Sequence, residues 1–127
     1  MEKNKSLLYG ELTYKIRGAI FAVRNELSSG HKEVVYHKAL AKEFDIRGIS
    51  FITEKSLVVS YKGQSVGVYR PDFIIDGKIV LEIKALPFLP RITEIQMSYY
   101  LKSTKYKLGL IVNFGSEELE IKRRIYT

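Results

Sequence analysis

The sequence predicts an α/β fold in which a mixed central β-sheet is flanked by helices. Apolar residues recur at helical spacing in the first third of the chain, whereas short runs rich in Val, Ile, Tyr and Phe fill the middle and the end. One predicted helix lies between two such runs, where a parallel crossover can form. The predicted order of elements is α-α-β-β-β-α-β-β.

Two amphipathic helices are predicted first. In residues 11–27, apolar side chains recur at spacings of three and four, as on one face of a helix. The following Ser-Ser-Gly ends this helix, and Ser28 or Ser29 is expected to cap the next one, at about 32–47. The predicted buried positions of the second helix are Val34, Val35, Ala39, Leu40 and Phe44.

Three strands are predicted next. Residues 51–75 indicate a strand, a turn at Lys62-Gly63 and a second strand, because β-branched and aromatic residues dominate on both sides of the turn. Residues 78–85 form the third strand, after Asp76-Gly77.

A helix and two strands complete the predicted fold. Pro90 suits the first turn of a helix that reaches about residue 103. Residues 107–114 are almost continuously apolar, which is typical of a strand covered on both faces. Residues 118–126 alternate as a final strand. The helix residues expected to be buried are Ile92, Ile95, Tyr99 and Leu101.

Three charged residues stand inside the predicted strands rather than at their ends. Glu82 and Lys84 are two apart, so they share one face of their strand. A two-residue turn at Asp76-Gly77 would put Asp72 and Glu82 on opposite faces, whereas a three-residue turn or a bulge would put them side by side. The sequence leaves both registers open.

Opposed carboxylates on neighbouring strands require a cation or a shared proton. Asp72, Glu82, a backbone carbonyl such as that of Ile83, and water molecules would suit Mg²⁺ or Mn²⁺. Lys84 could then orient or deprotonate a water molecule, or stabilise charge on a phosphate, which points to phosphodiester hydrolysis. On spacing alone, a solvated surface hairpin is the simpler interpretation of the same residues, because acidic-x-basic triplets are common on strands.

Longer segments carry a resemblance to a known family. The segments "YRPDFIIDGKIVLEIKA", "IQMSYYLKSTKYKLGLIVNFG" and "IKRRI" resemble the GxxExxxR protein family, a branch of the PD-(D/E)XK nuclease superfamily. The likeness extends over about residues 12–125. It implies a restriction-endonuclease-like core, a single nuclease domain over residues 1–127 with a flexible N-terminus at 1–10, and hydrolysis of DNA with Mg²⁺ or Mn²⁺ in DNA repair or processing.

The resemblance also assigns roles to individual residues. It implies that Asp72 and Glu82 are metal ligands, that Lys84 is the catalytic lysine, and that Glu33 helps to complete the metal site. Gly30 and Glu33 match the naming motif of the family, whereas His37 stands where the motif has Arg.

Gln96 and Tyr100 match a further motif, the QxxxY pattern of RecB-like nucleases. Four residues apart on a helix, they share a face. The resemblance implies that they position the substrate or its water molecule. Without it, a packed tyrosine and a solvated glutamine are the simpler interpretation.

The net charge of +7, from 21 basic and 14 acidic residues, favours a nucleic-acid partner. Arg70 could reach a phosphate or neutralise Asp72. Lys122, Arg123 and Arg124 form a second basic cluster. The predicted substrate-binding residues are Arg70, Lys102, Lys105 and Lys107, and binding through them should weaken with salt.

The composition excludes several other classes of protein. The chain has no cysteine, so disulfides and thiolate metal sites are excluded. His31 and His37 are six apart and do not suggest a zinc site. No segment resembles a signal peptide or a membrane span, and a cytoplasmic location is expected. The alternative function is a weak or inactive nuclease-fold module that binds nucleic acid or a protein partner; a homodimer could face both DNA strands.

Overall fold

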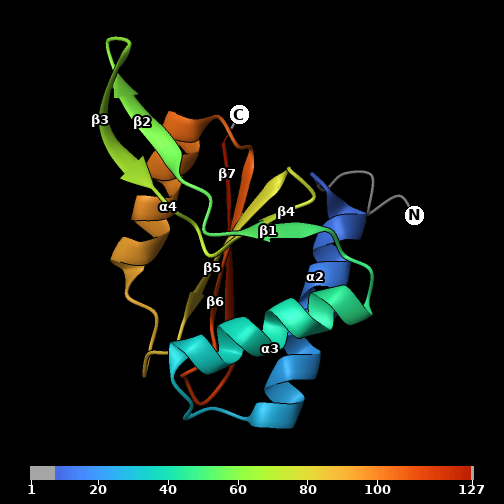
Figure 1. The fold of residues 1–127 in the computed structure, drawn as a ribbon. Helices are drawn as coiled ribbons and strands as arrows, with labels where there is room; N and C mark the ends of the chain where they lie inside the picture. Colours follow the sequence, from blue (N-terminus) through green and yellow to red (C-terminus); the bar gives the residue numbers. More distant parts are fainter. Residues whose placement is uncertain (1–7, 127) are drawn as a thin grey trace.

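The computed structural model describes residues 8–126, which form three helices and seven strands (Figure 1). In chain order these are α2 (Gly10–Leu27), α3 (Glu33–Ile46), β1 (Phe51–Thr53), β2 (Leu57–Tyr61), β3 (Gln64–Tyr69), β4 (Phe73–Ile75), β5 (Ile79–Lys84), α4 (Arg91–Thr104), β6 (Leu108–Asn113) and β7 (Glu120–Ile125). Of the N-terminus predicted to be flexible, residues 1–7 lie outside the described residues, whereas 8 and 9 form a turn and Gly10 begins α2.

The central sheet has five strands in the order β1-β4-β5-β6-β7. β5 and β6 are parallel and α4 connects them, whereas the other neighbouring pairs are antiparallel. The predicted mixed sheet and its single parallel crossover are therefore confirmed. β2 and β3 form a separate two-stranded sheet.

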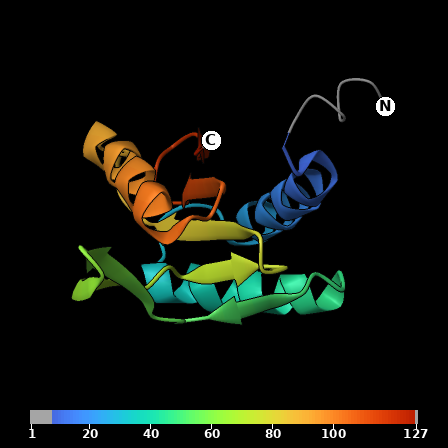
Figure 2. The same cartoon turned by 90° about the horizontal axis from the view of Figure 1, so that it is seen from above.

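The helices cover both faces of the sheet. Seen from above, α2 and α4 lie on opposite sides of the strands near β7 (Figure 2). Leu81 and Ile83 of β5 pack into the core formed with α2 and α3, whereas Val80 belongs to the smaller core under α4. Alternation along β5 thus directs every second side chain to the α4 side, where Glu82 and Lys84 also point.

α3 buries Leu40 and Phe44 as predicted, but not the whole of the predicted stripe. Val34 and Val35 are exposed, and the helix packs through Tyr36, Leu40 and Phe44, each four residues after the last. Tyr36 can occupy the core because its hydroxyl donates to the Ser28 carbonyl at 2.7 Å.

The predicted cap of α3 by a serine is also wrong. The N-cap residue is Lys32, and no side chain caps it. Ser28 instead contacts α3 through its backbone carbonyl, which accepts a hydrogen bond from the Tyr36 hydroxyl.

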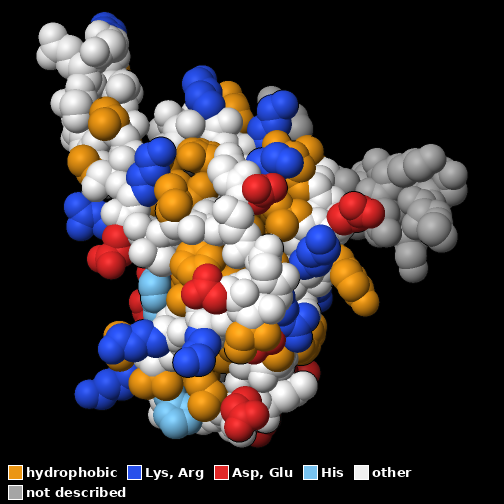
Figure 3. All heavy atoms as spheres, turned by 45° about the vertical axis from the view of Figure 1, so that its right-hand side comes forward, with side chains coloured by type: hydrophobic (Ala, Val, Ile, Leu, Met, Phe, Trp, Pro, Cys, Tyr) orange, Lys and Arg blue, Asp and Glu red, His pale blue; other side chains and the backbone are white. Residues whose placement is uncertain are grey.

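The predicted strand pair at 51–75 is split into four strands. The turn at Lys62-Gly63 is confirmed, with positive φ angles at both residues as a tight hairpin turn requires. However, the chain also breaks at Glu54, whose φ is 56°, and at Pro71, which has no backbone N–H to donate. The central segment therefore leaves the sheet as the β2–β3 hairpin, which stands clear of the body (Figure 3).

α4 packs through Met97 and Leu101. Leu101 was predicted to be buried, but Ile92 and Tyr99 are exposed and Ile95 is only partly buried. The helix lies across one face of the sheet, so only a narrow stripe is covered.

β6 is buried along its whole length, as predicted for a strand covered on both faces. β7, at the edge of the sheet, is partly exposed. None of the helices in residues 8–126 has the length and apolar character needed to span a bilayer.

Candidate active site

The turn between β4 and β5 decides whether Asp72 and Glu82 meet. Phe73 pairs with Leu81 and Ile75 with Ile79, so three residues form the turn. Of the two registers that the sequence left open, this is the one that places Asp72 beside Glu82 on the same face.

Asp72 is fixed against β5 by the backbone. Its Oδ2 accepts a hydrogen bond from the Ile83 N–H at 2.7 Å. Its carboxyl also shares a hydrogen bond with Glu82. Two carboxylates can share a bond in this way only when a proton lies between them.

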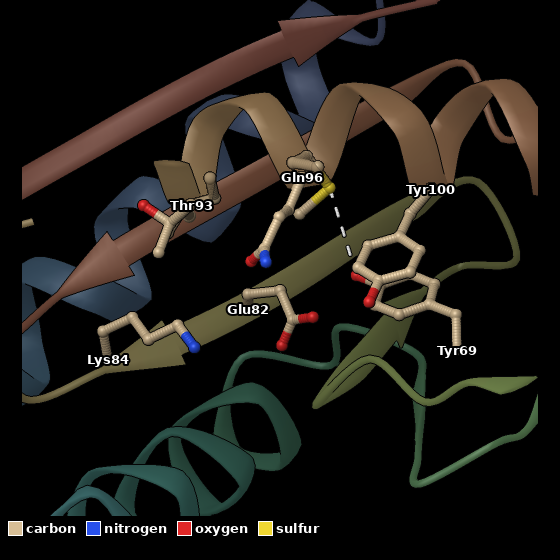
Figure 4. A pocket seen from close by; sticks show the side chains of 8 residues that line it. Tyr69, Glu82, Lys84, Thr93, Gln96 and Tyr100 are labelled. Carbon is tan, nitrogen blue, oxygen red and sulfur yellow. Dashed lines mark hydrogen bonds between the residues drawn. The ribbon is translucent and has the colours of Figure 1, made fainter. Parts of the chain in front are cut away.

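Glu82 and Lys84 rise from β5 toward α4, and Gln96 and Tyr100 point down from the helix to meet them (Figure 4). The pocket that they enclose has a volume of about 30 Å³, enough for about two water molecules. Its lining residues are Tyr69, Glu82, Lys84, Thr93, Gln96, Met97, Tyr100 and Ile111.

The charge of Glu82 is disfavoured in this pocket. Burial raises the pKa of Glu82 to about 7, and the neighbouring Asp72 carboxylate acts in the same direction. The Tyr69 hydroxyl, which donates to Glu82, and the Lys84 ammonium oppose this shift. Near neutral pH the pair of acids therefore carries negative charge that the protein compensates only in part.

A divalent cation suits this pair of acids. A cation beside Asp72 and Glu82 would replace the shared proton and allow both carboxylates to ionise. In the part of the chain that the structure describes, no group of three or more His, Cys, Asp or Glu side chains could hold a metal ion. Two carboxylates are nevertheless enough for Mg²⁺, which commonly keeps several waters and binds substrate phosphate as well.

Glu33 lies at the start of α3, near the same acids. Partial burial and the charge of Asp72 raise the pKa of Glu33, whereas Lys84 and His37 lower it. The ring of His37 stacks on Phe73, with centroids 4.5 Å apart. α3 therefore brings Glu33 within electrostatic reach of the site, and its role as a metal ligand stays a prediction.

Tyr69 is a pocket residue that sequence analysis missed. It ends β3, and its ring stacks on Tyr100 with centroids 3.8 Å apart and planes inclined by 4°. Its hydroxyl also lies 4.0 Å from the sulfur of Met97. Burial, together with the Glu82 carboxylate, raises the pKa of Tyr69. The stack joins the base of the β2–β3 hairpin to α4. It stabilises the folded protein by about 0.5–1.5 kcal/mol, in addition to the effect of burying the apolar area of the rings.

Thr93 also lines the pocket and was not predicted. Its hydroxyl donates to the Pro90 carbonyl, within the first turn of α4. Thr93, Gln96 and Tyr100 are spaced by three and four residues, so one helical stripe presents all three. This spacing is the sequence pattern from which Thr93 could have been predicted to line the pocket.

A buried amide holds the loop between β5 and α4. Asn113 Oδ1 accepts from the N–H groups of Leu86, at 2.8 Å, and Gly115, at 3.1 Å. Its Nδ2 donates to the Leu86 carbonyl and to Glu120, which in turn accepts from the Leu89 N–H. The hydrogen bond from Asn113 lowers the pKa of Glu120. Sequence analysis gave this asparagine no role because it lies within an apolar strand.

The predicted substrate-binding residues occupy two different regions. Arg70 lies at the base of the hairpin and donates twice to the Ser56 hydroxyl, at 3.2 and 3.0 Å. Lys102 is exposed on α4. Lys105 and Lys107 line a separate hollow of about 370 Å³ with Lys78, where β5 and β6 begin, whereas Lys84 ends β5.

The second basic cluster is partly engaged within the fold. Arg123 donates to the Leu8 carbonyl at 3.0 Å, and Arg124 lies 3.7 Å from Glu94 of α4. Lys122 remains exposed. Alternation along β7 directs Arg123 to the face opposite Lys122 and Arg124, so the three residues do not form one basic surface.

The chain was also compared with known proteins. The family model described as the PD-(D/E)XK nuclease superfamily matches residues 10–124. Among solved structures, one titled "Crystal structure of SSO0001" is similar, with a TM-score of 0.55 and 23 % sequence identity over 92 % of this chain and 57 % of that chain. This chain thus spans little more than half of that relative. Both findings fit the predicted restriction-endonuclease-like fold. No curated protein matches the chain.

Proposed function

Since this chain belongs to the PD-(D/E)XK nuclease superfamily, we propose that it is a metal-dependent nuclease that hydrolyses phosphodiester bonds in DNA. One observation carries the proposal. The three-residue turn between β4 and β5 brings Asp72 beside Glu82, and Glu82 and Lys84 line the pocket beneath α4. Two acids that can hold a metal ion, a neighbouring lysine and a positive net charge suit the hydrolysis of a phosphodiester.

Asp72 and Glu82 would hold Mg²⁺ or Mn²⁺, with Glu33 of α3 close by. When bound, such an ion would act as a Lewis acid on a phosphoryl oxygen and lower the pKa of a water molecule. The hydrogen bond from Ile83 would keep the Asp72 carboxylate in place.

Lys84 would stabilise negative charge on the phosphate or take a proton from the attacking water. Its position beside Glu82 supports both roles. The amide of Gln96 would orient a water molecule in the narrow pocket, and Tyr100, supported by its stack on Tyr69, would contact a phosphate.

The GxxExxxR family is the branch that we propose for this chain. Gly30 adopts a φ of 109°, a backbone conformation that residues other than glycine rarely adopt. Glu33 follows three residues later, at the start of α3. His37, in place of the arginine of the motif, stacks on Phe73. The proposal predicts that Glu33→Gln weakens cleavage by less than the loss of Asp72 or Glu82 does.

A cleavage assay tests the nuclease proposal. Labelled single- and double-stranded DNA would be incubated with Mg²⁺, with Mn²⁺ or with chelator, and Lys84→Ala would serve as the blank. We expect cleavage only with metal, and a loss of at least about 100-fold in rate for Lys84→Ala with unchanged circular dichroism. Lys15→Ala, which removes an exposed lysine on α2 at the other face of the sheet, is the matched control. Equal cleavage by Lys84→Ala and the parent would contradict the assignment.

A binding module without turnover is the second candidate function. It is favoured by the finding that residues 8–126 contain no group of three potential metal ligands. Titration calorimetry with Mn²⁺ separates the candidates. Uptake of metal that is lost in Glu82→Ala supports the nuclease, whereas no uptake by the parent protein supports the module.

A further inference from the structure

The β2–β3 hairpin, residues 57–69, exposes apolar side chains that a folded protein usually buries. Their exposed fractions are 55 % for Val58, 62 % for Tyr61, 63 % for Val66 and 57 % for Val68. A two-stranded hairpin has little stability of its own in water. Such a hairpin with an open apolar face is therefore suited to contact a partner.

The base of the hairpin is anchored, which leaves its opposite face outward. Leu57 packs against the core under α4, and its strand partner Tyr69 stacks on Tyr100. The next pair along the ladder is Val58 and Val68, which alternation directs to the other face. The hairpin projects from the body beside α4 (Figures 1 and 3).

The charges of the hairpin select the kind of partner. Lys62 is the one charged residue within the hairpin, and Lys55 and Arg70 flank its base with no acidic residue between them. At the tip, the ammonium of Lys62 lies 5.4 Å from the centre of the exposed Tyr61 ring. An aromatic ring beside a cation matches a base and its phosphate, the two features of an unpaired nucleotide. A surface with this charge is complementary to a polyanion.

The hairpin is also continuous with the candidate active site. Tyr69 ends β3 and lines the pocket that contains Glu82 and Lys84, and Asp72 follows it by only three residues. Nucleic acid that reaches the pocket beside Tyr69 therefore lies next to the hairpin.

We propose that the β2–β3 hairpin is a nucleic-acid-binding arm that holds unpaired nucleotides next to the site of cleavage. Tyr61, which strand alternation places on the same face of the hairpin as Leu57 and Tyr69, stacks on a base, and Lys62 contacts a phosphate at the tip. A base must be unstacked to meet Tyr61, so the arm prefers single-stranded over fully paired substrates. This inference rests on the proposed function in that it takes the substrate to be nucleic acid.

The chain offers a matched control for the test. Tyr14 and Lys15 form the same Tyr-Lys dipeptide, both exposed, on α2 at the other face of the sheet. Fluorescence anisotropy in chelator would measure the binding of a single-stranded oligonucleotide and of a duplex to Tyr61→Ala/Lys62→Ala and to Tyr14→Ala/Lys15→Ala. Chelator prevents cleavage, so binding is measured alone.

We expect the hairpin variant to lose affinity for single-stranded DNA on the order of ten-fold or more. Its slope of log affinity against log salt should become shallower by about 0.7. Its affinity for the duplex should change less, and the α2 variant should bind both as the parent does. Equal losses in both variants, or no loss in the hairpin variant, would overturn the proposal.

A second copy of the chain is the competing partner for the apolar face. Sedimentation of the parent and of the variant Val58→Thr/Val68→Thr would show whether the hairpin holds two copies of the chain together. A parent dimer that this variant dissociates, with unchanged DNA affinity, would make the hairpin a protein interface and overturn the proposal.

The arm and the proposed function can fail separately. Cleavage by a parent whose DNA affinity is unaffected by the Tyr61→Ala/Lys62→Ala change would refute the arm alone. Binding that depends on the arm, by a parent that does not cleave DNA with any metal, would refute the nuclease alone.

Discussion

The carboxyl of Glu82 is disfavoured as an anion because it is buried and lies beside Asp72. Its pKa rises from 4.5 to about 7. Between these values the unfolded chain releases a proton that the folded chain keeps. The free energy of unfolding therefore falls as the pH rises through this window, by at most about 3 kcal/mol. A residue that destabilises its own fold at neutral pH is typical of a functional site.

Glu82→Gln should remove this penalty in metal-free protein. Chemical denaturation in chelator should show a variant that is more stable than the parent at about pH 8, with little difference at about pH 4, where both side chains are neutral. Glu26→Gln, an exposed glutamate on α2, should change stability at neither pH. A gain for Glu82→Gln of the same size at both pH values would show that packing, and not ionisation, causes the effect.

The residues of the site differ in how far their positions could be predicted from the sequence. The shared face of Glu82 and Lys84 follows from strand alternation alone, because they are two residues apart. The position of Asp72 depended on the length of one turn, which the sequence left open. Tyr69 could not be found, because it reaches the pocket across a break between two strands, and no local pattern records such a contact.

At the scale of elements, the bounds of the helices could be predicted closely, but the pairing of the strands within residues 51–75 could not. Helical spacing is a local property, and α2 begins within one residue of its predicted start. The composition of a strand instead indicates how buried it is, but does not indicate which strand it pairs with. The run was therefore expected as one hairpin, whereas its middle forms the separate β2–β3 arm and its ends join the central sheet.

The connection from β5 to α4 sets the distance between Lys84 and Gln96. A Cβ at Gly115 would overlap the backbone of Ala85 and Leu86. Asn113 holds the same loop by its amide. Close backbone contact on one side and hydrogen bonds on the other fix the start of α4.

Gly115→Ala should therefore destabilise the protein by about 1–3 kcal/mol or more, and the surviving folded protein should cleave DNA more slowly because the loop is displaced. Gly67→Ala is the matched control, since a Cβ there stands 4.0 Å from Val59. We expect it to change stability by at most about 0.5 kcal/mol. Thermal unfolding and cleavage rates would be compared, and equal stability of the two variants would contradict the close contact.

At the scale of the whole molecule, the sequence predicts the charge but not where it gathers. The net charge is +7. Arg123 and Arg124 are partly engaged by the fold, whereas Lys105 and Lys107 meet Lys78 in the hollow where β5 and β6 begin. Residues that are adjacent in the sequence are thus separated, and residues far apart are brought together, by strand pairing that composition does not encode.

This separation predicts how binding depends on the length of the DNA. β5 spans Ile79–Lys84, roughly 17 Å at about 3.3 Å per residue, or about five base pairs of duplex. Lys105→Ala/Lys107→Ala should leave the affinity for shorter duplexes unchanged, because they cannot join the pocket to the hollow. For longer duplexes, anisotropy in chelator should show weaker binding and a salt slope shallower by up to about two, one for each lost phosphate contact. Lys15→Ala/Arg17→Ala on α2 removes the same charge and controls for its general effect. If both double variants weaken the binding of short and long duplexes alike, net charge alone attracts the DNA and the hollow is not part of its path.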